Sequence, residues 1–363
     1  MPQCSQSSVP TLKDIAAKLG LSIGTVERAL HNKGGYSAKT QARVLEEAAR
    51  CGYVANPAAS ALRRAPINIA VVLPEPVDED RYFFQYVWQG IDRALQELSV
   101  YKVQTFRHYA DTNSDEFIGE LEKMLEQEDP LPNGLITFTS TLPELSTVLD
   151  KYATHKIPVF LLNASEPSFE KYRYTLGAHH GVGKLGADIF SAIHKNTTGK
   201  LLVLGGSRTN IRQSTRANDF CTFVNRFCPR LTLMETHSYD RIQSKEFIRQ
   251  YAKAFDDFVG IYAVSARETL GMCESVHELG LSGKLTTVGM DVFPELLPYF
   301  EDDTLTASIY QYPAQQGYVA VKRLVSHITG AKEESSASSF TATVAFKSNA
   351  AAFTSNVFLM FAP

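Results

Sequence analysis

Several side chains in this 363-residue sequence could bind a small polar ligand. They follow short apolar runs of the kind that form buried strands, and they include aromatic, amide, carboxylate and guanidinium groups. The set is Phe83, Phe84, Asn163, Arg216, Ser265, Asp291 and Gln311. Planar polar groups pair with hydroxyls, and aromatic rings cover C–H patches. Because ligands bind beyond the carboxyl ends of parallel strands, this set favours a sugar or another polyhydroxylated ligand.

Alternative roles exist for some of these residues. Phe83 and Phe84 are adjacent and point in different directions, so one of them is expected in the core. Arg216 could instead pair with an acidic neighbour. Trp88, inside a predicted helix, favours core packing over ligand contact.

A second set of residues, near the N-terminus, could contact nucleic acid. It comprises Ser22, Ile23, Gly24, Thr25 and Arg28, which together begin a short predicted helix. The first turn of a recognition helix in the major groove faces the base edges. Arg28 can contact guanine through two hydrogen bonds, or a phosphate instead. Ile23 can meet a thymine methyl group, whereas Gly24 offers no side chain for base readout.

Motifs for catalysis are missing from the sequence. It contains no GxSxG or HExxH motif, and its glycine pairs lack the rest of a nucleotide-binding fingerprint. The adjacent His179 and His180 lack a carboxylate partner at metal-ligand spacing. The five cysteines form no CxxC pair, which favours reduced thiols. We therefore expect neither an enzyme nor a bound metal or cofactor.

The N-terminal residues predict three short helices. Ser22 and Ser37 are candidate N-caps, and Gly20 is a candidate C-terminal stop. The predicted helices cover residues 12–19, 23–31 and about 38–51. Val44, Leu45, Ala48 and Ala49 are expected to form the apolar stripe of the third helix. The pattern predicts an all-α helix-turn-helix headpiece over residues 1–55.

From Ile67 onward, strands and helices alternate along the chain. About ten such units exceed one small sheet, so we predict an α/β body of two lobes, each a doubly wound parallel sheet. The expected N-lobe is 67–175 plus 293–325, and the expected C-lobe is 176–292 plus 326–363. Residues 56–66 form a predicted hinge or linker.

Charge divides the chain in the same way. The net charge is −3, but residues 1–64 carry nine basic and four acidic side chains, +5, and the remainder carries 27 and 35, −8. A basic headpiece on an acidic body indicates a polyanionic partner. No apolar run is long enough for a membrane span, and the first residues lack a secretory signal, so we expect a cytoplasmic protein.

The headpiece resembles the DNA-binding domain of the lactose-repressor (LacI) family. The similarity covers residues 10–64 and is carried by TLKDIA, LS..TV.R, SAKT, GY and NPAA..L. Glu27 stands where the family usually has serine. The resemblance implies phosphate contacts by Lys13, Ser22, Ser37, Lys39 and Thr40. It also implies a hinge containing Asn56 and Ala59, with Leu62 as an apolar wedge in the minor groove.

The body resembles a type I periplasmic-binding-protein fold. YFFQYVWQG, VGMD and YQYPAQQG match segments of its sugar site. His179 and His180 replace an Asp-Asn pair, and Ser265-Ala266 replaces an Asn-Asp pair common in sugar binders.

Together the two resemblances imply a nucleoid-associated transcription regulator, a homodimeric repressor of double-stranded operator DNA. Its effector would be a sugar, polyol or sugar phosphate bound between the lobes. One alternative is a sugar-binding transport or chemotaxis receptor, which has no use for the headpiece. The other is an enzyme on a doubly wound fold, which lacks a catalytic motif.

Overall fold

The computed structural model describes residues 10–30, 34–53, 65–112, 114–126, 130–140, 142–163, 174–176, 181–208, 210–237, 240–331 and 341–355. It divides the chain into two compact units, the headpiece up to Arg64 and the body from Ala65 onward. No helix of the described residues is long and apolar enough to cross a membrane.

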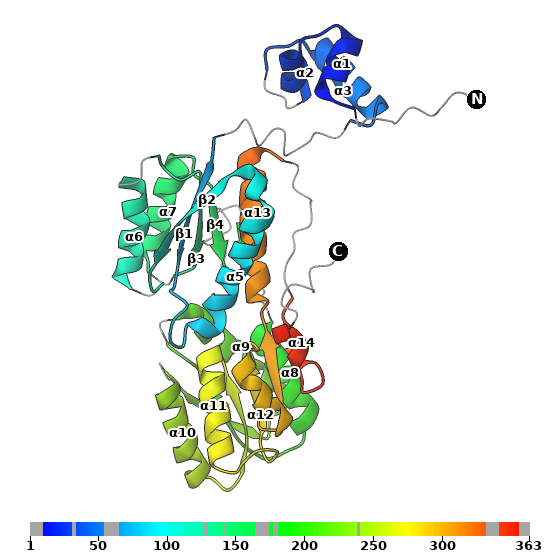
Figure 1. Ribbon diagram of the computed structural model, residues 1–363. Coiled ribbons are helices and arrows are strands. Elements are labelled where there is room, and N and C mark those ends of the chain that lie inside the picture. Colours follow the sequence, from blue (N-terminus) through cyan, green and yellow to red (C-terminus); the bar gives the residue numbers. More distant parts are fainter. Residues whose placement is uncertain are drawn as a thin grey trace, which may run out of the picture. The chain divides into compact units, whose positions relative to one another are not determined.

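The headpiece consists of three helices, α1 (Leu12–Leu19), α2 (Ile23–Leu30) and α3 (Ala38–Arg50) (Figure 1). Thr11 and Asp14 form a capping box at the start of α1, and Gly20 ends α1 with a φ of 66°. The hydroxyl of Ser22 accepts a hydrogen bond from the Thr25 amide at 3.1 Å. Ser37 caps α3 in the same way through Thr40, also at 3.1 Å. The predicted helix starts are therefore confirmed.

The core of the headpiece contains one side chain that the sequence did not predict. Ile15, Val26 and Val44 are fully buried, one from each helix. Leu45 and Ala49 were expected beside them, but Leu45 is 48% exposed and Ala49 is exposed as well, and Glu47 is buried instead. Arg50 and Lys18 form ion pairs with the Glu47 carboxylate at 2.8 and 3.3 Å, which offsets its loss of hydration.

The first lobe of the body is a parallel sheet in the order β2-β1-β3-β4-β5. Its strands are β1 (Ile67–Leu73), β2 (Val103–Tyr109), β3 (Gly134–Phe138), β4 (Val159–Leu162) and β5 (Tyr174–Leu176). Helices α6 (Asp115–Glu126) and α7 (Glu144–Thr154) cover one face. Helices α5 (Arg81–Glu97) and α13 (Pro313–Thr329) cover the other, with the 3₁₀ turn η1 (Ser99–Tyr101) after α5 (Figure 1).

The second lobe is a six-stranded sheet in the order β11-β10-β9-β8-β6-β7. Its strands are β6 (Gly199–Leu204), β7 (Leu231–Thr236), β8 (Phe258–Ala263), β9 (Thr286–Met290), β10 (Ala307–Tyr310) and β11 (Thr343–Ala345). Pairing is parallel except for the edge strand β11, which runs antiparallel to β10.

Helices cover both faces of the second sheet. α8 (Val182–His194) and α9 (Ile211–Phe227) pack on one face. The other face is covered by α10 (Arg241–Ala254), α11 (Ala266–Glu278), η3 (Pro294–Leu296), α12 (Leu297–Glu301) and α14 (Ala350–Ser355). The two doubly wound sheets of the body are thus confirmed.

Two expected lobe boundaries are wrong, the one before residue 293 and the one after residue 325. Residues 293–310 were assigned to the N-lobe, but β10 pairs with β9 in the second sheet. The chain enters the first lobe only at Pro313 and stays there through Thr329, because α13 packs against α5. Strand periodicity does not indicate which sheet a strand joins. The point at which the polypeptide passes from the second lobe to the first could therefore not be predicted from the sequence.

Candidate functional site

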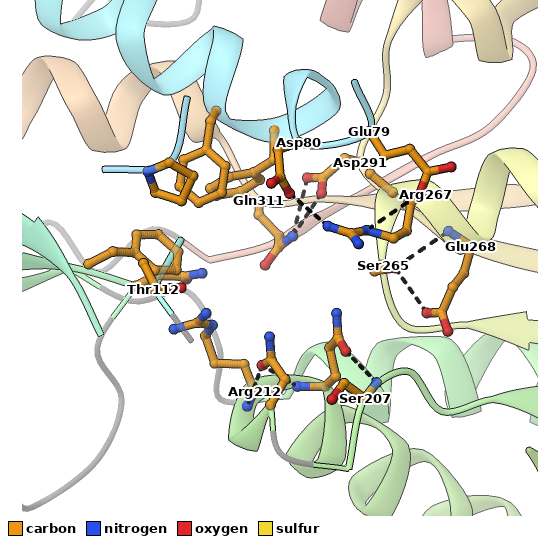
Figure 2. Close-up of a pocket in the computed structure, with 18 of the residues that line it drawn as sticks. Glu79, Asp80, Thr112, Ser207, Arg212, Ser265, Arg267, Glu268, Asp291 and Gln311 are labelled. Atoms are coloured by element: carbon orange, nitrogen blue, oxygen red, sulfur yellow. Dashed lines mark hydrogen bonds and ion pairs between the residues drawn. The ribbon is translucent and has the colours of Figure 1, made fainter. Parts of the chain in front are cut away.

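A cavity of about 410 Å³ opens at the carboxyl ends of strands from both lobes (Figure 2). The seven residues expected from the sequence, Phe83, Phe84, Asn163, Arg216, Ser265, Asp291 and Gln311, all line it. They come from six separate segments of the body, and only the two sheets bring them together. The volume lies in the lower part of the range of ligand sites, ~300–1,000 Å³.

Three buried polar side chains in this cavity are linked by hydrogen bonds, and they are called the buried triad below. The Arg216 guanidinium donates to the side-chain oxygen of Gln311 and, at 2.9 Å, to the carbonyl of Val264. The Gln311 amide donates to both oxygens of Asp291 at 3.2 and 3.0 Å (Figure 2). A glutamine therefore separates the cation from the anion and orients both.

Burial affects the ionisation of the two charged members of the buried triad. It raises the pKa of Asp291 to about 7, and the nearby Arg216 opposes the rise. Burial also lowers the pKa of Arg216. Two hydrogen bonds from Gln311 favour the ionised form of Asp291. The carboxyl group is thus able to change its charge near neutral pH.

Two residues of the site have strained backbone. Asn163 and Asp291, directly after β4 and β9, have φ values of 62° and 61°. The left-handed region is unfavourable for most residues but is tolerated best by Asn and Asp. In addition, the buried side-chain oxygen of Asn163 has no hydrogen-bond partner among the described residues. Such strain is typical of binding sites held in place by the surrounding fold.

Aromatic rings form one wall of the cavity. Phe83 and Phe84 pack edge-on against Phe138, with ring centroids 6.1 and 5.2 Å away. Phe84 is buried and belongs to the core of the first lobe, whereas Phe83 is only partly buried. Trp88 is in the core, as expected, where its indole N–H donates to the Pro74 carbonyl at 3.2 Å.

Ser265 lines the cavity but also caps α11. Its hydroxyl accepts from the Glu268 amide at 3.4 Å and donates to the Glu268 carboxylate at 2.9 Å. The structure therefore gives Ser265 a local role that was not expected from the sequence.

Two arginines in the cavity were missed at the level of the sequence, and both connect the lobes. Arg212 of α9 donates to the carbonyl of Thr139, beyond β3, at 2.7 Å. Arg267 of α11 donates to Asp80, at the start of α5, at 2.7 Å. Figure 2 shows Arg212 and Arg267 on different sides of the open space.

A capping signal could have revealed Arg212. Asn210 accepts hydrogen bonds from the Arg212 and Gln213 amides at 3.2 and 3.3 Å, so α9 begins at Ile211. With the start at Ile211, Arg212 and Arg216 are one helical turn apart and share a face.

The headpiece exposes the residues that were expected to contact DNA. Ser22, Ile23, Gly24 and Arg28 of the α2 region are exposed or partly exposed, and Thr25 is partly buried. Arg28 extends along α2, and its Nε donates to the Gly24 carbonyl at 3.2 Å. Lys13, Ser37 and Lys39 are exposed as well, and Thr40 is partly buried.

Some expected residues lie outside the described part of the chain. They are Asn56, Ala59 and Leu62 of the hinge, and His179 and His180. Among the described residues, no group of three His, Cys, Asp or Glu side chains is arranged to hold a metal ion.

A curated relative and several solved structures resemble the body. The D-allose-binding periplasmic protein of Escherichia coli (strain K12) is 25% identical over 150 residues, which are 41% of this chain and 45% of that protein. The chain thus spans less than half of that relative.

Among solved structures, a glucose-galactose binding protein from Geobacillus stearothermophilus has a TM-score of 0.65 at 23% identity, covering 79% of this chain and 99% of that one. A solute binding protein from Agrobacterium radiobacter in complex with D-arabinose has a TM-score of 0.66 at 20% identity, covering 78% and 96%. One from Actinobacillus succinogenes 130z with bound D-allose has a TM-score of 0.65 at 17% identity, covering 79% and 99%. At these identities the likeness shows the fold.

Family models account for both units of the chain. The model of bacterial regulatory proteins of the lacI family matches residues 11–56, and the model of the periplasmic binding protein domain matches residues 69–332. The second match covers well over half of the chain. The chain therefore belongs to the periplasmic binding protein domain family through its body, and its helix-turn-helix headpiece is that of the lacI family of bacterial regulatory proteins.

Proposed function

We propose that this protein is a sequence-specific transcription regulator, a repressor that binds a near-palindromic operator as a homodimer. A sugar, polyol or sugar phosphate in the cavity between the lobes controls its operator affinity. In this proposal α2 reads bases in the major groove, residues 56–66 act as the hinge, and the body senses the effector. The two-fold symmetry of a dimer matches two operator half-sites.

The observation that supports an effector site in the cavity is the buried triad of Arg216, Gln311 and Asp291. Charged groups are rarely buried to this degree without a structural or functional partner. The buried triad offers hydrogen-bond donors and acceptors beside the aromatic wall, and this mixture suits a polyhydroxylated ligand.

In this proposal effector binding is coupled to operator binding because residues of both lobes line the cavity. A ligand that contacts Asn163 of the first lobe and Asp291 of the second binds best at one particular separation of the lobes. It therefore shifts the population toward that separation by as much as its affinities for the two states differ. The hinge transmits this shift to the two headpieces.

The DNA assignment is tested with a labelled duplex taken from upstream of the protein's own gene. The full-length protein is titrated against this duplex and a scrambled one, with fluorescence anisotropy as the readout. Arg28→Ala is expected to weaken specific binding by about 1–3 kcal/mol and to change binding to the scrambled duplex far less. Arg230→Ala, at an exposed arginine of the body, is the matched control. Absence of any specific binding at low salt would refute the proposal.

The effector assignment is tested in the same assay. D-allose, D-arabinose and D-glucose are added with their phosphorylated forms. At least one compound is expected to shift operator affinity, and Asp291→Asn is expected to remove the response. Asp256→Asn, at an exposed residue before β8, should respond like the unaltered protein.

A further inference from the structure

We infer that the cavity takes an uncharged polyhydroxyl compound of about monosaccharide size and discriminates against its phosphorylated form. This inference rests on the proposed function and narrows its effector class. It is carried by the charges around the cavity, by the partners of its arginines and by the caps of the helices that face it.

Acidic groups outnumber basic groups around the cavity. The described lining residues include five carboxylates, Glu79, Asp80, Asp111, Glu268 and Asp291, and three guanidinium groups, Arg212, Arg216 and Arg267. Protonation of Asp291 lowers this excess by at most one charge. A phosphate group entering the cavity would therefore meet a net negative field in a partly buried site, where like charges repel strongly.

Each of the three arginines already has acceptors or a ring as partners. Arg267 pairs with Asp80 at 2.7 Å and with Glu79 at 3.9 Å. Arg216 donates to Gln311 and to the Val264 carbonyl through its two terminal nitrogens, whereas its buried Nε has no hydrogen-bond partner in the described part of the chain. Arg212 donates to the Thr139 carbonyl and stacks on Phe138 at 4.3 Å. Arginine recognises phosphate through a free fork of donors.

Diverting Arg216 to a phosphate would be especially costly. Its positive charge and the Gln311 amide together compensate the buried carboxylate of Asp291. Moving it would leave that carboxylate without its cation, a strongly unfavourable arrangement in a buried site.

Two helix N-termini at the cavity, those of α9 and α11, are capped by side chains of the protein, whereas that of α5 has carboxylates beside it but no side-chain cap hydrogen bond. Asn210 accepts from the first amides of α9, and Ser265 and Glu268 form the cap of α11. Glu79 and Asp80 stand at the start of α5. A helix N-terminus attracts anions through free amides and its dipole, and here side chains of the protein already supply the acceptors or the negative charge.

An uncharged sugar fits the same environment. Its hydroxyls can donate to the carboxylates and to the side-chain oxygen of Asn163, which has no hydrogen-bond partner among the described residues. Its C–H face can lie against Phe83. Neither contact requires an arginine to leave its present partner.

The experiment measures matched pairs of ligands on the full-length protein by thermal shift and calorimetry. The pairs are D-glucose and glucose 6-phosphate, D-allose and allose 6-phosphate, and D-arabinose and arabinose 5-phosphate. For the sugar that binds, its phosphate is expected to bind at least about 100-fold more weakly. Equal or tighter binding of the phosphorylated member would overturn the inference while leaving the proposed function standing. A flat response to every compound would refute the sugar effector itself, and with it the inference.

A charge variant tests the cause. Glu79→Gln with Asp80→Asn removes two carboxylates and releases Arg267, so the preference for the neutral sugar should fall about tenfold or more. Asp80→Asn alone should give a smaller change in the same direction, and Asp256→Asn should give none. The double variant is informative if it still binds the neutral sugar. If its preference for the neutral sugar over the phosphate is then unchanged, the electrostatic explanation is contradicted.

Discussion

At the scale of single residues, the buried carboxyl group of Asp291 is the most informative feature. It lies after β9, in a left-handed backbone conformation, with both oxygens accepting from Gln311. Its pKa is raised from 3.8 to about 7 because burial penalises the charged form more than Arg216 favours it. Folding stability and pH are therefore coupled through this residue.

The sign of that coupling gives a prediction. Between about pH 4 and 7 the folded protein keeps a proton on Asp291 that the unfolded chain has lost. This residue therefore stabilises the fold fully below about pH 4, and its contribution falls as the pH rises toward 7, by on the order of 1 kcal/mol per pH unit. Relative to Asp291→Asn, the unaltered protein should lose stability between about pH 5 and 7 in thermal unfolding. Asp256→Asn serves as the control. A difference in stability between the unaltered protein and Asp291→Asn that stays constant from about pH 5 to 7 would contradict the prediction.

At the scale of elements, the pairing of α5 with α13 joins distant parts of the sequence. α13 follows a strand of the second lobe but packs on the first sheet. Two glycines allow the helices to approach closely. A Cβ at Gly90 would lie 1.8 Å from the Ala314 carbonyl oxygen, and a Cβ at Gly317 would lie 2.1 Å from the Val87 carbonyl oxygen.

Gly90→Ala is therefore expected to be destabilising. The added methyl group would force the backbones of α5 and α13 apart, at a cost of about 1–3 kcal/mol or more. Gly119→Ala on α6 is the matched control, because a methyl group at that position would meet nothing within 4 Å. That change should be neutral or stabilising by ~0.5–1 kcal/mol. Urea unfolding measures both, and equal effects would refute the role of close packing.

At the scale of the whole molecule, charge separates the two units. The headpiece carries +5 and the body −8, so the near-neutral total conceals the basic surface. An acidic body contributes no net attraction to DNA, which concentrates phosphate binding in the headpiece.

The salt dependence of operator binding should reflect this separation. If Lys39 neutralises one phosphate in each headpiece, Lys39→Ala should make the slope of log affinity against log salt shallower by about 2 for a dimer. Lys253→Ala on α10 removes the same exposed charge from the body and should leave the slope unchanged. Anisotropy titrations from low to moderate salt measure both slopes. A Lys39 variant with an unchanged slope would remove its proposed phosphate contact.

Local sequence determined much of this protein. The caps at Thr11 and Ser37 follow from side chains within four residues of the backbone groups they satisfy, and Gly20 ends α1 because glycine readily adopts the left-handed backbone conformation. The alternation of strands and helices in the body was equally readable. All seven candidate cavity residues could be named because parallel strands bring their carboxyl ends to one edge.

The tertiary structure decided what depends on partners far along the chain. It buried Glu47 rather than Leu45, because Lys18 of another helix pairs with that carboxylate. It placed β10 in the second sheet and α13 on the first. It also brought Arg267 to Asp80 and linked Arg216 to Asp291 through Gln311. Periodicity and capping act within one or two turns, whereas strand pairing, burial and charge compensation depend on which distant segments the fold brings together.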